Sequence, residues 1–277
     1  MRRSTIALMI KQSYKFRIYP NKEQEVVLKR TIGCCRYVYN WALQMRSDAY
    51  KKDKTNISLC KSCKNLTALK SEVEWLKEVS SVPLQQSLRQ LEHGFSGFLK
   101  GERRYPKFRK KKSGGSARFV KTAFYLKNDL FYIAKIKSPI KIVWSRELPF
   151  IPSSCTITQN LSGQWFASFI CKEEPINLLK NKKSIGIDLG ITSFATFSDG
   201  KVVKQPNSIK DNRKKVSKNQ RRHHKKKIGS KNREKSRIKL AKVHQKIVNI
   251  RTDFLQKLST SIVRENQVIA IEDLKVS

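Results

Sequence analysis

The spacing of apolar and polar positions along the first hundred residues predicts a strand followed by helices. Tyr14–Ile18 alternates aromatic or apolar residues with basic ones, which is typical of a half-buried strand. Asn21, with Gln24 three residues later, predicts a capping box at the start of a helix. Apolar residues then recur at mostly helical spacing, so we expect residues 21–104 to form a mainly helical module.

A second helix in this module is expected to begin at Ser81-Val82-Pro83, because proline is tolerated in the first helical turn. Gly101 is expected to end it. An apolar face is the side by which such a helix packs. The apolar residues that share one face of this helix are Leu84, Leu88, Leu91, Phe95, Phe98 and Leu99.

From about residue 105 the pattern changes to short alternating runs separated by turn residues, which predicts an antiparallel sheet or barrel. Ser162-Gly163 is expected to join the last two runs as a hairpin. The strand at 14–18 is expected to belong to the same β module, with the helices inserted between. The predicted strands are Ala117–Leu126, Leu130–Ile136, Ile140–Trp144, Cys155–Asn160 and Gln164–Cys171.

After a basic linker at Lys180–Lys183, three short runs predict a strand meander. A long helical region is then expected from about 209 to 265, broken at Gly229-Ser230, and a last strand at 268–272. The three runs of the meander are Ile185–Asp188, Ser193–Ser198 and Lys201–Lys204, with Asp199-Gly200 as a turn.

The whole pattern predicts an α+β multidomain chain. A helical module at 21–104 is inserted in an antiparallel β-barrel-like module made of 1–20 and 105–180. An α/β domain follows at 181–277.

Two strands of the last domain each end in a carboxylate, Asp188 and Glu272. The carboxyl ends of strands are where α/β sheets place their sites. Two acids held together repel each other unless a cation lies between them, so the pair predicts a Mg²⁺-dependent phosphodiester-cleaving site. Alternation puts Glu272 and Asp273 on opposite faces, so only one of them can share a site with Asp188. The alternative is a pair of ordinary strand-end acids at a solvated sheet edge.

The charge balance favours a polyanionic partner. The 277 residues include 60 Lys and Arg against 21 Asp and Glu, a net charge of +39. Such an excess destabilises a compact protein through self-repulsion, and nucleic acid is its usual reason. A membrane surface is the weaker alternative, because the basic runs lack an apolar face of matching length. No stretch approaches the ~18 apolar residues of a membrane span, so we expect a cytoplasmic protein.

The densest basic segment is 210–246, with 17 Lys and Arg against two acids. Nucleic-acid phosphates are its expected partner, and a solvated charged helix or disorder is the alternative. The candidate phosphate-binding residues of this segment are Arg213, Lys214, Arg221, Arg222, Lys225, Lys226, Arg233 and Arg237.

A second basic patch lies beside two aromatic residues, Tyr105 and Phe108. An aromatic ring next to basic residues can stack a base, although both rings could equally be buried where the chain enters the β module. The candidate cations here are Lys107, Arg109 and Lys110, together with Lys15 and Arg17 of the first strand.

The cysteines indicate reduced thiols rather than a disulfide framework. Cys60 and Cys63 have the spacing of half a zinc site, but no second pair follows. Zinc is therefore an unfavoured alternative at Cys60 and Cys63. The adjacent Cys34 and Cys35 lie in an apolar stripe and are expected to be core residues.

Several sequence motifs, in collinear order, resemble one family. Ile-Gly-Ile-Asp-Leu-Gly-Ile-Thr (185–192) and Val-Ile-Ala-Ile-Glu-Asp-Leu (268–274) look like the first and second motifs of a RuvC-type nuclease domain. The chain as a whole is similar to the TnpB (OrfB) family, RNA-guided nucleases encoded by insertion sequences and relatives of the type V CRISPR effectors. The further motifs are Tyr-Lys-Phe-Arg-Ile-Tyr-Pro-Asn-Lys-Glu-Gln (14–24), Cys-Arg-Tyr-Val-Tyr-Asn-Trp-Ala-Leu (35–43), Trp-Leu-Lys-Glu-Val (75–79), Val-Pro-Leu-Gln-Gln-Ser-Leu (82–88) and Tyr-Pro-Lys-Phe-Arg-Lys-Lys-Lys (105–112).

The resemblance implies an RNase H-like (RuvC) domain at 181–277, a wedge module at 1–20 plus 105–180, and a helix-turn-helix-like recognition module at 21–104. Asp188 matches the family's first catalytic aspartate and Glu272 its catalytic glutamate, which together hold Mg²⁺. The implied partners are DNA and a guide RNA from the transposon end, with the protein as a monomer on RNA.

The family's zinc ribbon and third catalytic aspartate would follow residue 277, so the resemblance implies an incomplete RuvC domain. The structural Zn of the family would then have no ligands in this chain. Two alternatives to a cleaving enzyme remain: a nucleic-acid-binding protein that does not cleave, or the remnant of a decayed insertion sequence. An unrelated basic RNA-binding protein is a further, less favoured alternative.

Overall fold

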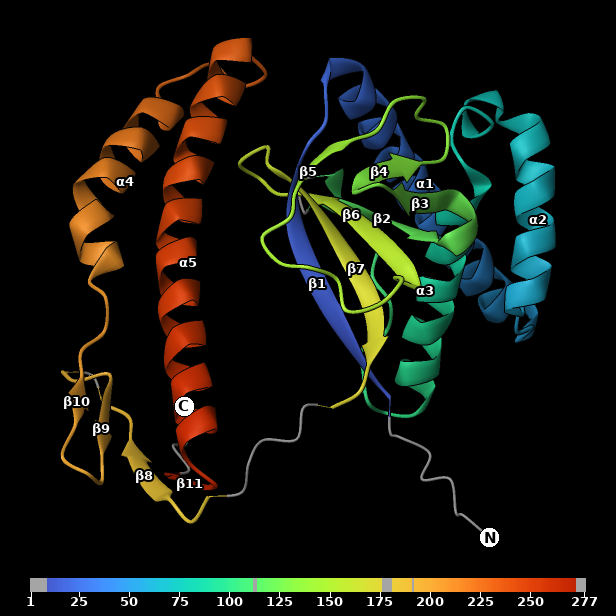
Figure 1. The fold of residues 1–277 in the computed structure, drawn as a ribbon. Helices are drawn as coiled ribbons and strands as arrows, with labels where there is room; N and C mark the ends of the chain where they lie inside the picture. Colours follow the sequence, from blue (N-terminus) through green and yellow to red (C-terminus); the bar gives the residue numbers. More distant parts are fainter. Residues whose placement is uncertain (1–8, 112–113, 176–180, 191, 273–277) are drawn as a thin grey trace, which may run out of the picture. The chain divides into compact units, whose positions relative to one another are not determined.

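The computed structural model describes residues 9–111, 114–175, 181–190 and 192–272. Asp273, Lys112 and Lys180 lie outside the described residues. The chain divides into two compact units, 1–175 and 176–277 (Figure 1). Within the described residues, no helix combines the length and the apolar composition needed to cross a bilayer.

The first unit is built from helices and short strands (Figure 1). Its helices are α1 (Lys22–Asp53), α2 (Leu59–Glu72) and α3 (Ser81–Leu99), with short 3₁₀ turns at Glu74–Leu76 and Lys121–Ala123. Its strands are β1 (Ile10–Tyr19), β2 (Gly115–Val120), β3 (Phe124–Lys127), β4 (Leu130–Ile133), β5 (Lys141–Val143), β6 (Ser154–Gln159) and β7 (Trp165–Glu173).

The start of α1 confirms the predicted capping box. Asn21 Oδ1 accepts from Gln24 N at 2.8 Å, and Gln24 Oε1 accepts from Asn21 N at 3.0 Å. Gln24 Nε2 also donates to Ser138 Oγ at 2.9 Å, so the cap ties the helix to the loop before β5. The predicted helix beginning at Ser81 is likewise confirmed as α3.

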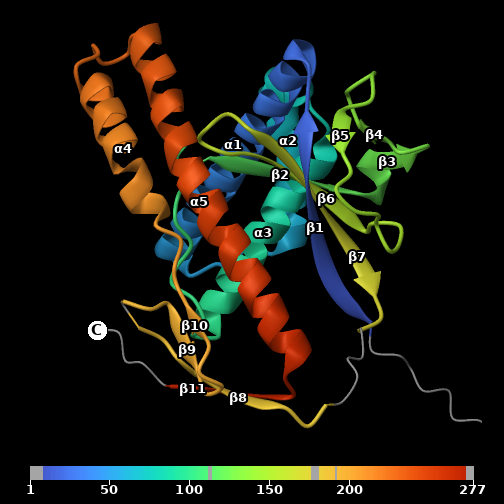
Figure 2. The same cartoon turned by 60° about the vertical axis from the view of Figure 1, so that its left-hand side comes forward.

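Five strands form one antiparallel sheet in the order β2-β6-β7-β1-β5 (Figure 2). β1 pairs with β7 from Ile10 to Ile18, so the first strand of the chain belongs to this sheet. The sheet stays open, with β2 and β5 at its edges, and the expected barrel is wrong. The 3₁₀ turn at Lys121–Ala123 interrupts the predicted strand Ala117–Leu126, and β3 leaves the sheet to pair with β4 as a separate hairpin.

One core joins this sheet to the helices and the β3-β4 hairpin. Alternate residues of β1 are buried, and the Phe169 ring of β7 meets those of Phe16, Phe124 and Phe131 at centroid distances of 6.0, 6.1 and 5.2 Å. Leu84, Leu88 and Leu91 of α3 are buried in the same core. The C-terminal end of the predicted apolar face is not buried. Phe98 is 40% exposed and Leu99, the last residue of the helix, is 75% exposed.

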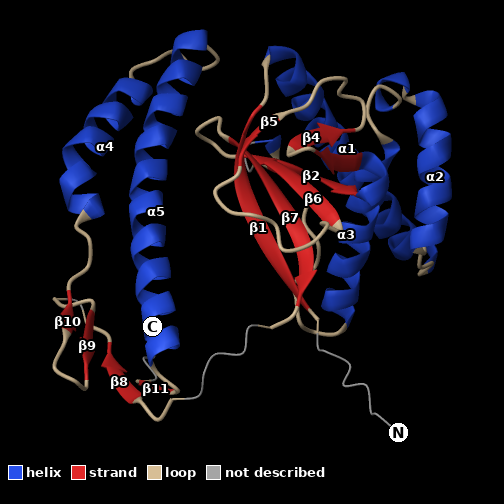
Figure 3. Ribbon diagram, in the orientation of Figure 1, coloured by secondary structure: helices blue, strands red, loops and turns tan. Residues whose placement is uncertain are grey.

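The second unit confirms the predicted meander and the predicted break in the long helix (Figure 3). Its sheet has the order β10-β9-β8-β11, in which β9 is antiparallel to both β8 and β10 while β11 runs parallel to β8. The elements are β8 (Ser184–Asp188), β9 (Ala195–Phe197), β10 (Val202–Val203), α4 (Ser208–His224), α5 (Lys231–Glu265) and β11 (Val268–Ile271).

The helices α4 and α5 follow β10 and precede β11 along the chain. They lie side by side as a hairpin (Figures 1 and 2). Gly229 has φ +83° in the connecting turn, a conformation that glycine adopts without steric cost. Ser230 then caps α5, its Oγ accepting from Arg233 N at 3.1 Å. The Arg233 side chain donates back to Lys226 O at 2.6 Å, so it closes the turn between the helices.

Candidate functional site

Parallel pairing of β8 and β11 brings the two strand-end carboxylates to one place. Ala270 pairs with Gly186 and Ile271 with Ile187, so the next residues, Glu272 and Asp188, end neighbouring strands at the same level. Both acids line one open depression, which we call the carboxylate depression. Its lining residues are Gly186, Ile187, Asp188, Thr196, Phe197, Ser198, Ala270, Ile271 and Glu272.

Alternation along β8 separates this depression from the core of the second unit. Ile185 and Ile187 belong to an apolar cluster that includes Leu258 and Ile262 of α5. Since side chains alternate between the two faces of a strand, Asp188 lies on the face opposite to α5. Its cross-strand partner on β9 is Thr196, which lines the same depression.

Two glycines, Gly186 and Gly190, flank Asp188. Gly186 N donates to Ser198 Oγ at 3.0 Å and its carbonyl accepts from Ser198 N at 2.9 Å, which fixes the floor of the depression. A Cβ on Gly190 would come within 3.0 Å of the Ser193 carbonyl oxygen, so the loop after β8 favours glycine there. The space that a side chain would need beside each glycine is taken by Ser198 and Ser193 of the protein itself, so these glycines let the neighbouring chain pack closely around Asp188.

The site offers two carboxylates as ligands for a cation. Asp188 and Glu272 are both exposed, and within the described part of the chain no cluster of three or more His, Cys, Asp or Glu is found. Carboxylate oxygens are the donors that Mg²⁺ prefers, and Mg²⁺ keeps several waters when few protein ligands are present. The donor set therefore fits a hydrated Mg²⁺ ion.

The basic residues predicted on the helical hairpin fall into two groups. Arg233 and Arg237 are half-buried and engaged within the protein: Arg233 closes the turn, and Arg237 pairs with Glu234 at 2.7 Å, which raises the pKa of Arg237. The other group is exposed and forms no ion pair in the described part of the chain. These residues, the hairpin cations, are Arg213, Lys214, Arg221, Arg222, Lys225 and Lys226.

The second basic patch divides in a similar way. Lys107 and Lys110 are exposed, whereas Arg109 is half-buried and lies 3.6 Å from the Tyr39 ring centroid. Burial lowers the pKa of Arg109, although the Tyr39 ring and hydroxyl favour its charge. Its Nη2 donates to Gln90 Oε1 at 3.0 Å, so Arg109 orients another side chain.

The two aromatic residues of this patch also differ. Tyr105 packs edge-on against Phe95 and Phe98 at 5.5 and 5.2 Å, and its hydroxyl lies 2.7 Å from Ser47 Oγ. Its ring is therefore held by packing. Phe108 is 52% exposed and remains available for stacking.

On the outer face of the open sheet, cations lie over aromatic rings. Lys15 Nζ is 4.4 Å and the Arg17 guanidinium 5.1 Å from the Phe166 ring centroid. Arg17 Nη1 is buried and has no hydrogen-bond partner in the described structure.

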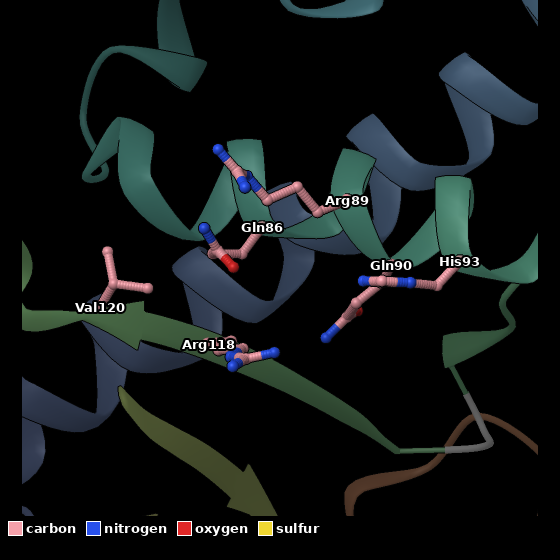
Figure 4. A pocket seen from close by; sticks show the side chains of 6 residues that line it. All are labelled: Gln86, Arg89, Gln90, His93, Arg118 and Val120. Carbon is pink, nitrogen blue, oxygen red and sulfur yellow. The ribbon is translucent and has the colours of Figure 1, made fainter. Parts of the chain in front are cut away.

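The structure also contains a polar cavity that was not predicted from the sequence. It has a volume of about 370 Å³ and lies between α3 and β2 (Figure 4). None of its lining residues is acidic, and Arg118 Nε is buried without a partner in the described structure. The spacing i, i+3, i+4, i+7 of its polar residues on α3 is the signal that could have revealed it. Its lining residues are Gln86, Arg89, Gln90, His93, Arg118 and Val120.

The six cysteines are free thiols. Cys34 and Cys35 are buried in the core of the first unit, as predicted, and burial raises the pKa of Cys34 to about 11 and that of Cys35 to about 12. Cys60 lies in the first turn of α2 and is exposed, and Cys63 begins the second turn and is half-buried.

Comparison with known proteins places the chain among transposon-encoded proteins. A family model described as "Probable transposase" (OrfB_IS605) matches residues 168–277, and one described as "Helix-turn-helix domain" (HTH_OrfB_IS605) matches 9–55. Among solved structures, a Cas12f1 complex with single-guide RNA and target DNA aligns with 96% of this chain and 82% of its own at a TM-score of 0.44 and 13% identity.

Two relatives align with almost the whole chain. The "Putative RNA-guided DNA endonuclease" of Streptomyces pristinaespiralis is 41% identical over 272 residues, which cover 96% of this chain and 68% of the relative. The "Putative RNA-guided DNA endonuclease InsQ" of Escherichia coli K12 is 32% identical over 270 residues, which cover 96% of this chain and 67% of the relative. Identity of this extent, along two thirds of both relatives, shows that the chain belongs to the TnpB (OrfB) family of insertion-sequence transposase proteins.

Proposed function

We propose that this protein is an RNA-guided, metal-dependent DNA endonuclease whose reaction takes place at the carboxylate depression. The observation that carries the proposal is the parallel pairing of β8 with β11, which sets Asp188 beside Glu272 on one face of the sheet. The two relatives that align with almost the whole chain are named putative RNA-guided DNA endonucleases, which supports DNA as the proposed substrate class.

We also propose that residues 181–277 form an RNase H-like (RuvC-type) domain. The strand order supports this: an antiparallel meander of β8, β9 and β10, with a parallel strand added beside β8 after a helical crossover. We assign 1–20 plus 105–180 to a wedge module and 21–104 to a recognition module. The pairing of β1 with β7 supports an insertion of the helices between parts of one sheet.

In this mechanism Asp188 and Glu272 would hold the ion, and each would supply negative charge. When bound there, Mg²⁺ would act as a Lewis acid toward a phosphoryl oxygen and would lower the pKa of a bound water. Gly186 and Gly190 let Ser198 and Ser193 pack closely beside Asp188, which shapes the depression that the phosphodiester would enter. Ser198 fixes Gly186 through two hydrogen bonds and so keeps the floor of the site in place.

The basic surfaces would bind the DNA and the guide RNA through their phosphates. The hairpin cations form no ion pair within the described residues, and they can displace counterions from a polyanion. Lys107, Lys110 and Lys15 are exposed and suited to the same contacts. The cavity between α3 and β2 adds two arginines and the amide groups of Gln86 and Gln90, whose acceptors can form hydrogen bonds that lysines cannot.

The test removes one carboxylate charge at a time. We expect Asp188→Asn and Glu272→Gln each to abolish guide-dependent DNA cleavage and to weaken Mn²⁺ binding, measured by electron paramagnetic resonance without nucleic acid. Asp199→Asn is the matched control, because Asp199 lies in the β9–β10 turn, where its Oδ1 accepts from Lys201 N, and does not line the depression. Cutting that survives in either variant contradicts the assignment. Guide-dependent binding without cutting by the unaltered chain would favour the non-cleaving alternative.

A further inference from the structure

The β3-β4 hairpin has two different faces. Its pairing register sets Phe124 opposite Ile133 and Leu126 opposite Phe131, and these residues form the face turned to the core. The alternate pairs, Tyr125 with Tyr132 and Lys127 with Leu130, occupy the outward face. Tyr125, Lys127 and Leu130 are exposed, so this face is open to solvent.

On that outward face the two tyrosine rings lie parallel. Their centroids are 4.7 Å apart and their planes differ by 10°, whereas the core pairs Phe124–Phe131 and Phe131–Phe169 meet edge-on. Tyr125 is 57% exposed despite this contact. One ring face of Tyr125 is therefore covered by Tyr132, while the residue as a whole stays more than half exposed.

Hairpin stability alone does not account for this exposed ring. A cross-strand aromatic pair contributes about 0.2–1 kcal/mol to a hairpin. The hairpin is already anchored by Phe124, Phe131 and Ile133, which are 5%, 0% and 3% exposed. A flat aromatic ring held in place by its stacked neighbour and left in water can stack a nucleobase.

The charge around the platform indicates the kind of ligand. Residues 121–141 contain five lysines and one acid, Asp129. All five lysines are exposed, and Lys127 shares the outward face with the tyrosine pair. A flat aromatic surface bordered by lysines matches a nucleobase flanked by phosphates. The lysines are Lys121, Lys127, Lys135, Lys137 and Lys141.

We propose that the outward face of the β3-β4 hairpin binds an unpaired segment of RNA, with one base stacked on Tyr125 and a neighbouring phosphate on Lys127. The bases of a duplex are stacked on each other and cannot reach a side-chain ring, whereas RNA presents unpaired bases in loops and ends. The assignment of RNA rests on the proposed function, which supplies an RNA partner. The platform itself uses no residue of the carboxylate depression.

The first experiment measures stacking directly. A 12-nucleotide unstructured RNA carrying one 2-aminopurine is titrated with the whole chain in 200 mM salt, without divalent metal. We expect 2-aminopurine fluorescence to be quenched on binding, and Tyr125→Leu to weaken the affinity about tenfold, which corresponds to about 1.4 kcal/mol. Tyr125→Phe should keep the affinity, because it keeps the ring.

Salt dependence separates the two contacts. Tyr125→Leu should leave the slope of log K against log salt unchanged, while Lys127→Gln should reduce it by about 0.7, the value for one phosphate on a single strand. Tyr50→Leu is the matched control, because Tyr50 is 56% exposed on α1 and also has a lysine, Lys54, 5.1 Å from its ring centroid, but belongs to no stacked pair within the described residues. A loss of affinity in Tyr50→Leu equal to that in Tyr125→Leu overturns the proposal.

A second measurement needs no variant and therefore does not depend on folding of the leucine substitution. The unaltered chain is photocrosslinked to a 4-thiouridine RNA, and the crosslinked peptides are mapped by mass spectrometry. We expect crosslinks within residues 124–132, reduced by unlabelled RNA and much less by DNA of the same sequence. Crosslinks confined to other segments, or equal competition by DNA, overturn the assignment. Loss of metal binding at Asp188 leaves this result unchanged, so failure of the two proposals can be told apart.

Discussion

At the scale of single residues, pairing register decides which side chains the second sheet brings together. A shift of β11 by one residue would move Glu272 to the α5 side and bring Ile271 to the level of Asp188. Alternation in the sequence was enough to predict that Asp188 and Glu272 can share a face. It could not predict that Arg109 and Tyr105 are engaged within the protein, because their partners Gln90, Tyr39 and Phe95 are distant in sequence.

Tyr14 gives a residue-scale prediction about pH. Its hydroxyl donates to Glu173 at 2.5 Å, and this hydrogen bond, together with burial, raises the pKa of Tyr14 to about 12. An unfolded tyrosine titrates near 10, so the folded state holds the proton more tightly. The contribution of Tyr14 to stability is therefore complete below pH of about 10 and is lost as the pH rises through about 12.

The measurement compares urea unfolding of the unaltered chain and Tyr14→Phe at pH 9 and pH 11.5. We expect the free energy of unfolding to fall more steeply with pH in the unaltered chain, because only that chain has the Tyr14 hydroxyl to ionise. Lysine titration affects both proteins alike and cancels in the comparison. Tyr50→Phe, at an exposed site, serves as the control. Parallel pH profiles for Tyr14→Phe and the unaltered chain would show that the hydrogen bond to Glu173 is not formed.

At the scale of elements, features that depend on residues close in sequence were predicted correctly, and features that depend on contacts with distant residues were not. The capping box at Asn21 and the break at Gly229-Ser230 depend on residues close in sequence, and both are confirmed. The division of Ala117–Leu126 was missed, because β-propensity does not show where a chain leaves one sheet for another. The burial of Leu84 and the exposure of Leu99 on one predicted face likewise depend on where α3 finds a partner.

The helical hairpin yields a prediction at this scale. Replacing Arg221, Arg222, Lys225 and Lys226 together by Gln should weaken duplex DNA binding and flatten the slope of log K against log salt. The expected reduction is up to about 3.6, at about 0.9 for each phosphate that the variant no longer neutralises. All four side chains are exposed, so the hairpin itself should stay folded.

The measurement is fluorescence anisotropy between 50 and 200 mM salt, with circular dichroism to check the helices. Replacing Arg221 and Arg222 by Lys, and leaving Lys225 and Lys226, keeps the charge and should keep the slope. A slope that the four Gln substitutions do not alter would exclude the hairpin from phosphate contact.

At the scale of the whole molecule, the net charge affects the stability of the folded chain more than any single contact does. A net charge of +39 on 277 residues opposes compactness, and the described ion pairs are few and mostly exposed. The sequence predicted this imbalance and the mixed α+β class directly. The sequence could not show that the sheet stays open instead of closing into a barrel, since this depends on whether the edge strands β2 and β5 meet.

We expect the melting temperature of the chain without nucleic acid to rise with added monovalent salt. Each kcal/mol of self-repulsion that is screened should raise it by about 2–4 °C. A polyanion such as heparin should raise it further, because a ligand bound only to the folded state stabilises that state. Differential scanning calorimetry checks both effects. A melting temperature that falls between 50 and 500 mM NaCl would contradict the role given to self-repulsion.

The parallel pairing of β8 with β11 also has a consequence for the order of folding. More than 80 residues separate Asp188 from Glu272, and the whole α4–α5 hairpin lies between them. Non-local strand pairs form slowly, because the entropy lost on closing the intervening loop must be accepted before the strand contacts can offset it. During synthesis β8, β9 and β10 emerge long before β11. The carboxylate pair is therefore assembled after the meander, and a newly made chain gains the proposed cation site only once the basic hairpin has been synthesised.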